Sequence, residues 1–150
     1  MKAEPGNRIP VLRHRVSGEA MQVWARVLDD PNPIHVDREF VRSHGLGDNL
    51  INQGPANLAY LINALTAAFP EAFLESIDVR FLGNVFAGET VEASGVIEAI
   101  ESAGEHSRIV CAMSLEAPGR GPVVAGRATV ILPNRKNQPV IVKGHLREWI

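Results

Sequence analysis

The sequence predicts an α+β fold in which helices occupy the first half of the chain and an antiparallel sheet the second. Two segments of the first half repeat apolar residues at three- and four-residue steps, which is the period of an amphipathic helix. From Ser76 onward the period changes to two, as in strands. With 150 residues and 45% hydrophobic content, the chain is expected to fold as one domain, residues 1–150.

The first helix is expected after a strand over residues 9–15. Ser17 is a good N-cap for it, because its hydroxyl can accept a hydrogen bond from a free N–H of the first turn. A turn rich in proline follows, and Asp37 is expected to cap a short helix after that turn. The residues predicted to form the apolar stripe of the first helix are Met21, Trp24, Ala25 and Leu28.

A second, longer helix is predicted from Gly54-Pro55 to Pro70. Gly54 suits the cap and Pro55 the first helical position, where a missing N–H costs nothing. Four apolar residues form its stripe and several alanines keep it slim, so it is expected to lie against a sheet. The stripe consists of Leu58, Leu61, Ile62 and Leu65.

The second half of the chain is expected to be a meander of four antiparallel strands, because only short links rich in glycine and proline separate them. The tail, residues 133–150, begins polar and basic and ends apolar, which predicts a C-terminal extension packed on an apolar surface. The four predicted strands are residues 76–81, 90–100, 108–116 and 123–132.

Composition excludes several classes of partner. The formal net charge is −2 and no long basic run occurs, so no nucleic acid partner is expected. The most apolar stretch, residues 58–69, is too short to cross a bilayer, so no membrane partner is expected. The single cysteine, Cys111, cannot form an internal disulfide, and the first ten residues are polar. These features predict a cytoplasmic protein.

The segment Asp30-Pro31-Asn32-Pro33-Ile34-His35 is the strongest candidate for chemistry. It places a carboxylate and an imidazole on one stiff turn, because prolines fix their own φ and restrict the residues before them. A fully extended segment would separate Asp30 from His35 by roughly 16 Å, so a shared reacting atom requires the chain to fold back. The alternative is that these turn-forming residues only end the first helix.

Three blocks of the sequence resemble the MaoC-like hydratases and dehydratases, which include (R)-specific enoyl-CoA hydratases. The blocks are residues 30–35, then Ile51-Asn52-Gln53-Gly54, then residues 77–89 with Phe81 and Gly88-Glu89. The resemblance implies a single hot-dog fold, a long central helix wrapped by an antiparallel sheet. It also implies a homodimer that uses no cofactor and reversibly hydrates trans-2-enoyl thioesters of CoA or acyl carrier protein to (3R)-hydroxyacyl thioesters.

Site residues follow from the same resemblance. Asp30 and His35 would activate water, and the amide of Gly54, at a helix N-terminus, would stabilise the oxyanion. Asn32, Gln53 and Asn57 are expected to bind substrate. The sequence departs from the family's pattern at three places: Leu28-Asp29 replaces a Ser-Gly pair, Gln53-Gly54-Pro55 replaces His-Gly-Met, and Asn57 replaces a small hydroxyl residue.

Three alternatives compete with a hydratase. A hot-dog thioesterase would need a carboxylate on or near the central helix, and residues 55–69 contain no Asp or Glu. A non-catalytic acyl-thioester-binding subunit would not need both Asp30 and His35. A metal site could use these two residues with Asp37, but no spaced partner pair completes it, so no metal is expected.

Overall fold

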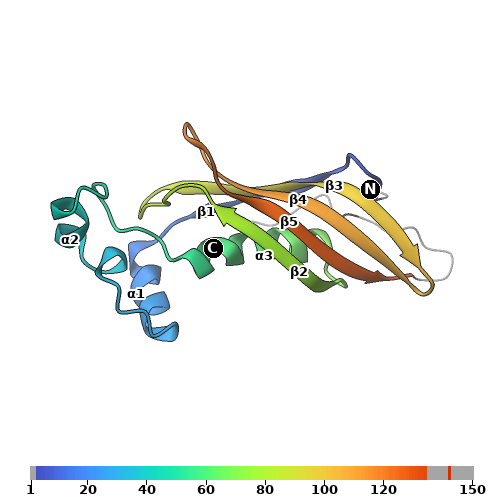
Figure 1. Ribbon diagram of the computed structural model, residues 1–150, viewed down its shortest axis with the longest axis horizontal. Coiled ribbons are helices and arrows are strands. Elements are labelled where there is room, and N and C mark those ends of the chain that lie inside the picture. Colours follow the sequence, from blue (N-terminus) through green and yellow to red (C-terminus); the bar gives the residue numbers. More distant parts are fainter. Residues whose placement is uncertain (1–2, 135–141, 143–150) are drawn as a thin grey trace.

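A five-stranded antiparallel sheet and one long helix form the body of the molecule. The computed structural model describes residues 3–134 and 142 (Figure 1). Figure 1 shows the long helix α3 beneath the sheet and two short helices, α1 and α2, beyond one end of it. The helices are α1 (Gly18–Val27), the 3-10 helix η1 (Pro33–His35), α2 (Arg38–Ser43) and α3 (Gly54–Ala68). The strands are β1 (Arg8–Arg15), β2 (Phe73–Phe81), β3 (Thr90–Ala103), β4 (His106–Ala117) and β5 (Gly121–Pro133).

The strand order is β1-β3-β4-β5-β2, so the predicted four-strand meander is wrong at β2. Strands β3, β4 and β5 do form a meander, but β2 pairs with β5 instead of β3. The link from β2 to β3 pairs with the segment before α3, through a bridge between Ile51 and Phe86 and a 2.7 Å hydrogen bond from Asn52 N to Val85 O. That pairing leads the chain away from β2 before β3 begins.

Helix α3 packs on the sheet through small and apolar residues, as the sequence predicts. Leu61 and Leu65 are buried, and each buried leucine contributes about 1.5–3 kcal/mol relative to an exposed one. The helix begins one residue earlier than expected, with Gln53 as N-cap and Gly54 as its first helical residue. Three alanines that are fully buried let the helix lie close to the strands: Ala56, Ala64 and Ala68.

Helix α1 contacts the core much less than its apolar stripe predicts. Ser17 caps it as expected, accepting a hydrogen bond from Ala20 N at 3.3 Å. Only Met21 of the stripe is buried, and Leu28 keeps 37% of its surface exposed. The reason is position, because α1 lies beyond the end of the sheet (Figure 1). The helix therefore carries the following turn outside the main core.

Three residues of the C-terminal extension are described: Pro133, which ends β5, Asn134 and Val142. Val142 is 1% exposed and belongs to the hydrophobic core. The other apolar residues of the tail, including Leu146 and Trp149, lie outside the described residues. Among the helices that the structure describes, none is long and apolar enough to span a membrane.

Candidate active site

The proline-rich segment folds back on itself directly after α1. Asp30 N donates to Ala25 O at 2.9 Å, which ends the helix, and the carboxylate of Asp30 accepts a hydrogen bond from Asn32 N at 3.2 Å. The side chain of Asn32 in turn accepts from Ile34 N at 3.3 Å and caps η1. These local bonds are those expected of Asp and Asn at a turn. The segment therefore has a defined shape built from its own side chains.

The turn brings Asp30 and His35 together. Asp30 Oδ2 lies 3.3 Å from His35 Nε2. On the other side of the ring, His35 Nδ1 lies 2.6 Å from the carbonyl oxygen of Ile51. A carbonyl only accepts hydrogen bonds, so Nδ1 carries a proton and, in the neutral ring, Nε2 presents its lone pair to Asp30. The pair can thus accept hydrogen bonds from both O–H groups of one water molecule and take one proton from it.

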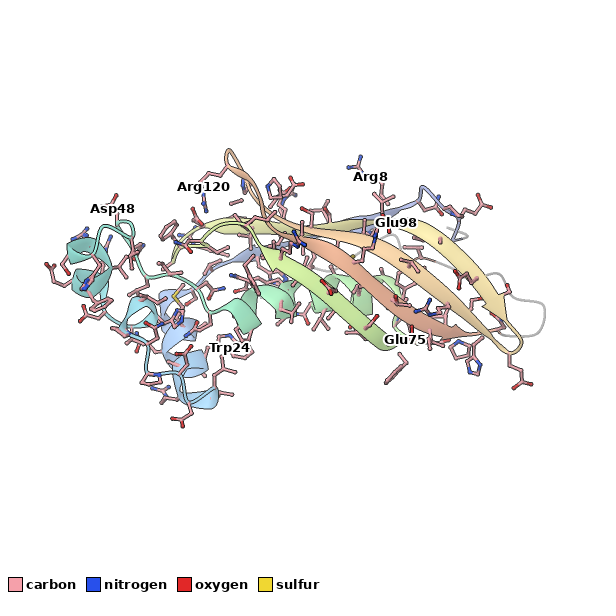
Figure 2. The ribbon with its side chains drawn as sticks, in the orientation of Figure 1. Arg8, Trp24, Asp48, Glu75, Glu98 and Arg120 are labelled. Carbon is pink, nitrogen blue, oxygen red and sulfur yellow. The ribbon has the colours of Figure 1, made fainter. Side chains whose placement is uncertain are left out.

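The two side chains differ in exposure. The side chain of His35 is 9% exposed, whereas that of Asp30 is 32% exposed. The imidazole is therefore held inside the protein while the carboxylate is open to a ligand. Figure 2 shows the surrounding region: Trp24 and Asp48 belong to this helical end of the molecule, far along it from Glu75.

Gly54 offers an amide without a partner. Within the described residues its N–H has no hydrogen-bond acceptor, as expected for the first turn of a helix, where the N–H groups lack intrahelical partners. Ile51, whose carbonyl contacts His35, stands three positions before Gly54. The chain between Ile51 and Gly54 therefore spans at most about 10 Å. A helix N-terminus favours negative charge, so this amide is suited to stabilise an oxyanion.

Neither packing nor backbone conformation requires glycine at position 54. Gly54 is absent from the residues with positive φ. A Cβ built on it would lie 3.4 Å from the nearest atom of the Phe81 ring, an ordinary contact. Glycine is also unfavourable in helices compared with alanine. Close approach of a ligand to the backbone is the remaining physical reason for a residue without a side chain.

Asn57 lies one helical turn after Gly54 and is held by a second amide. It is 3% exposed, and its Oδ1 accepts a hydrogen bond from Asn52 Nδ2 at 2.7 Å. Asn52 also bonds the hydroxyl of Tyr60; burial raises the pKa of this hydroxyl, and the hydrogen bond partly opposes the rise. The side chains of Asn52 and Asn57 therefore form a hydrogen-bonded polar cluster beside the start of α3.

Gln53 and Asn32, the other predicted substrate contacts, differ in exposure. Gln53 is 0% exposed, and its Nε2 donates to Met21 O at 3.0 Å. Its Oε1 is buried and has no hydrogen-bond partner among the residues that the structure describes, a state that costs about 1–3 kcal/mol. Asn32 is exposed, with its oxygen engaged by the backbone of the turn.

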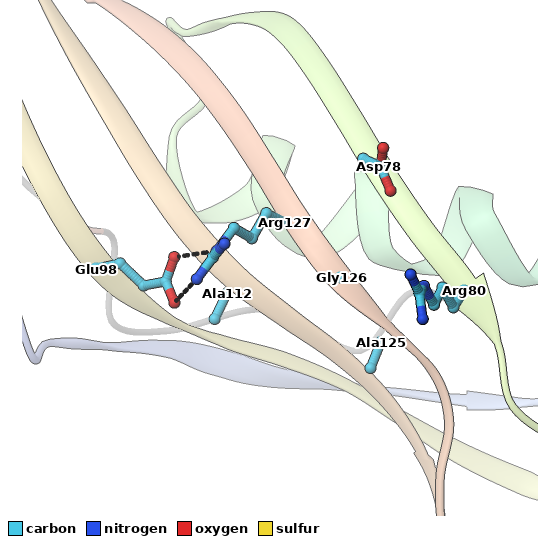
Figure 3. A pocket seen from close by; sticks show the side chains of 7 residues that line it. All are labelled: Asp78, Arg80, Glu98, Ala112, Ala125, Gly126 and Arg127. Carbon is cyan, nitrogen blue, oxygen red and sulfur yellow. Dashed lines mark hydrogen bonds and ion pairs between the residues drawn. The ribbon is translucent and has the colours of Figure 1, made fainter.

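A separate hollow on the sheet is lined by charged side chains, but its lining includes no histidine and so no pair like Asp30 and His35. Figure 3 shows Arg127 paired with Glu98, at 2.7 Å, over the small Ala112. Gly126 is required there by packing, since a Cβ would lie 2.0 Å from Asp78 O. The hollow lies over strands β2 to β5 and includes none of the predicted site residues. Within residues 3–134 and 142, no group of three or more His, Cys, Asp or Glu side chains could hold a metal ion.

Comparison with known proteins identifies the family. Residues 2–115 match the family described as the MaoC like domain. The chain belongs to the MaoC-like domain family. A relative from Arabidopsis thaliana, the mitochondrial 3-hydroxyacyl-[acyl-carrier-protein] dehydratase, is 29% identical over 121 residues, which are 79% of this chain and 71% of the relative.

Solved structures show that the MaoC-like chain has the hot-dog fold. The (R)-hydratase from A. caviae involved in PHA biosynthesis superposes with a TM-score of 0.79 and 22% identity, covering 87% of this chain and 98% of the other. The R-hydratase PhaJ1 from Pseudomonas aeruginosa gives a TM-score of 0.78 and 20% identity, covering 95% and 94%. The expected helix wrapped by an antiparallel sheet is therefore confirmed.

Sequence patterns missed two features of this MaoC-like site. The carbonyl of Ile51, which fixes the tautomer of His35, is a backbone group that no side-chain pattern reveals. The second feature is Asp29, whose φ of 50° is left-handed. Its signal was present in the sequence, because Asp29 stands where the family usually has glycine, the residue best suited to that conformation.

Proposed function

We propose that this protein is a hydro-lyase that reversibly adds water to trans-2-enoyl thioesters, giving (3R)-hydroxyacyl thioesters. The observation that carries the proposal is the 3.3 Å approach of Asp30 Oδ2 to His35 Nε2, with Nδ1 committed to the carbonyl of Ile51. A relative that is a 3-hydroxyacyl-[acyl-carrier-protein] dehydratase and structural neighbours that are (R)-hydratases support this class of reaction.

The reaction needs one water and two proton transfers. Water donates one hydrogen bond to Oδ2 of Asp30 and one to Nε2 of His35, and its oxygen attacks C3 of the enoyl group. As the C3–O bond forms, the electrons of the double bond move toward the thioester carbonyl, and the pair takes one proton from the water. The pair then returns a proton to C2, so its protonation is unchanged after turnover.

The enolate oxygen that forms during the attack needs a donor. The free N–H of Gly54, at the N-terminus of α3, is proposed to supply it. Asn57, one turn further, and Asn32, at the open side of the turn, are proposed to contact the substrate. Residues 54–68 of α3 include no carboxylate, which disfavours a thioesterase that depends on one.

A homodimer is proposed through the edge strand β2. This strand ends the sheet, and two of its aromatic residues are unusually open: Phe73 is 70% exposed and Phe81 is 55% exposed. An edge strand with exposed apolar residues is suited to pair with a second copy. Phe81 also lies next to Gly54, so the interface would border the site.

The test is turnover of crotonyl-CoA by the purified protein. Loss of enone absorbance without release of free thiol, with a product of R configuration, is expected. Asp30→Asn and His35→Ala should each lower kcat/KM by about 10²–10⁴-fold. Controls are Glu101→Gln, on β3, and His44→Ala, at exposed positions outside the site and outside β2, which should retain activity. Thiol release, or full activity of Asp30→Asn, would refute the assignment.

A further inference from the structure

Two different parts of the chain hold the acid/base pair. Asp30 continues from α1, since its N–H donates to Ala25 O at 2.9 Å. His35 is held by the 51–54 segment, the four residues that lead into α3, through the 2.6 Å contact of Nδ1 with Ile51 O. The separation of Asp30 Oδ2 from His35 Nε2 therefore depends on how α1 sits against the 51–54 segment.

Gln53 joins these two parts. Its Nε2 donates to Met21 O, in the middle of α1, at 3.0 Å. Within residues 3–134, no other hydrogen bond joins α1 to the 51–54 segment. Both Gln53 and Met21 are 0% exposed, so the bond is shielded from water and stronger than a surface bond.

The stability of the fold does not explain why residue 53 has an amide side chain. Gln53 stands at the N-cap of α3 but makes no side-chain bond to the helix. Its Oε1 is buried and, within residues 3–134 and 142, receives no hydrogen bond, which opposes folding. An apolar residue of similar size would avoid that penalty. The amide supplies only one thing that such a residue lacks, the hydrogen bond to α1.

We propose that Gln53 is a positioning residue for the hydration reaction. By tying α1 to the 51–54 segment, it sets the separation of the two proton-carrying atoms and their approach to the Gly54 amide. This inference rests on the proposed function. It differs from the substrate contact expected from the sequence, because a fully buried side chain acts through Asp30 and His35.

The experiment compares Gln53→Met with wild type. Methionine has a similar length but neither a donor nor the orphan acceptor, so Tm should stay within about 3 °C of wild type. A small misplacement of reacting groups can cost about 10²-fold in rate, so kcat is expected to fall by about 10–100-fold while KM changes less than about twofold. The pH profile of kcat and the ¹⁵N shifts of the His35 ring should both move.

Two further variants separate positioning from a merely structural role. Gln53→His restores an N–H donor and should recover most of kcat. Gln22→Met, on α1 but outside the 51–54 contact, should behave as wild type in every measurement. These comparisons distinguish the loss of one hydrogen bond from a general effect of methionine or of lost stability.

Each contrary outcome has a distinct meaning. Wild-type kcat, pH profile and ¹⁵N shifts in Gln53→Met would overturn the positioning role and leave the proposed function standing. Parallel loss of Tm and activity, with no recovery in Gln53→His, would also overturn it, as a structural effect. No hydration by the wild-type protein would refute the proposed function and, with it, this inference.

Discussion

Gly54 faces the ring of Phe81 across a gap that would hold a methyl group. A Cβ at Gly54 would lie 3.4 Å and 3.5 Å from two atoms of that ring. In contrast, a Cβ at Gly95 would lie 2.6 Å from both Ala112 O and Met113 Sδ. Glycine is therefore present at the two positions for different physical reasons. At position 95 the packing of the sheet leaves no room for a side chain, whereas at position 54 the missing side chain leaves the backbone accessible.

Gly54→Ala should separate folding from activity. We expect a free energy of unfolding within about 1 kcal/mol of wild type, because the methyl group fits and alanine is the better helix former. The kcat/KM for an enoyl thioester should fall by about 10-fold or more, since the methyl group would crowd the oxyanion position. Gly95→Ala is the control and should lose about 1–3 kcal/mol through overpacking. Wild-type kcat/KM in Gly54→Ala would show that the reaction does not need position 54 to lack a side chain; the variant leaves the N–H itself in place, because alanine also has a backbone N–H.

Asp29 should be the strained residue of the turn. Its φ of 50° is left-handed, a conformation that costs non-glycine residues about 1–2 kcal/mol. Asp29→Val should lower the free energy of unfolding by about 1–2 kcal/mol, because a β-branched residue tolerates this region poorly. Asp29→Gly should be neutral or stabilising and should remain active. Urea denaturation of the three proteins measures this, and equal midpoints for the valine and glycine variants would contradict it.

His14 should make stability depend on pH. It stacks on Tyr60 with ring centroids 4.5 Å apart, and its Nε2 has no hydrogen-bond partner in the described part of the chain. Burial lowers its pKa below the ordinary value. The unfolded chain therefore binds the proton more readily than the folded one. The contribution of this residue to stability is present above about pH 6.5 and is lost as pH falls through that value toward the lower folded pKa.

His14→Phe tests that dependence because phenylalanine keeps a ring on Tyr60 but cannot titrate. Urea denaturation at pH 7.5 and pH 5.5 should show a smaller loss of stability on acidification in the variant than in wild type. Identical losses in both proteins would mean that other groups carry the effect.

Cys111 should be inert in the folded protein. It is buried in β4, and burial, with a smaller effect from the charge of Glu98, raises the pKa of its thiol to about 12. The reactive thiolate is therefore scarce at pH 8. A chromogenic disulfide reagent should label almost none of the native protein within an hour and one thiol per chain in urea. Rapid labelling without urea would contradict the burial.

The parts of the fold that could be predicted from the sequence are those governed by neighbouring residues. Helix α3 and the turn at Asp30 follow from apolar spacing and from proline geometry, both local properties. The place of β2 beside β5 depends on contacts between residues far apart in sequence, and no periodicity encodes them. Leu28 shows the same limit, because its helical spacing is correct but α1 lies beyond the sheet that would have covered it.

The candidate site divides in a similar way. The identity and spacing of Asp30 and His35 suggested an acid/base pair, and the structure places the two side chains together. The tie between Gln53 and α1 joins residues separated by 32 positions, so only the folded chain reveals it. Side chains that serve as donors can be listed from a sequence, but their partners depend on tertiary structure.

The anchor on the inner nitrogen of His35 belongs to the main chain at Ile51. Every amino acid that could replace Ile51 still presents a peptide carbonyl, so point mutations at that position do not delete the group that selects the imidazole's tautomer. The tautomer of His35 is therefore insensitive to which amino acid occupies position 51, and divergent homologues can keep the same tautomer with a different residue there.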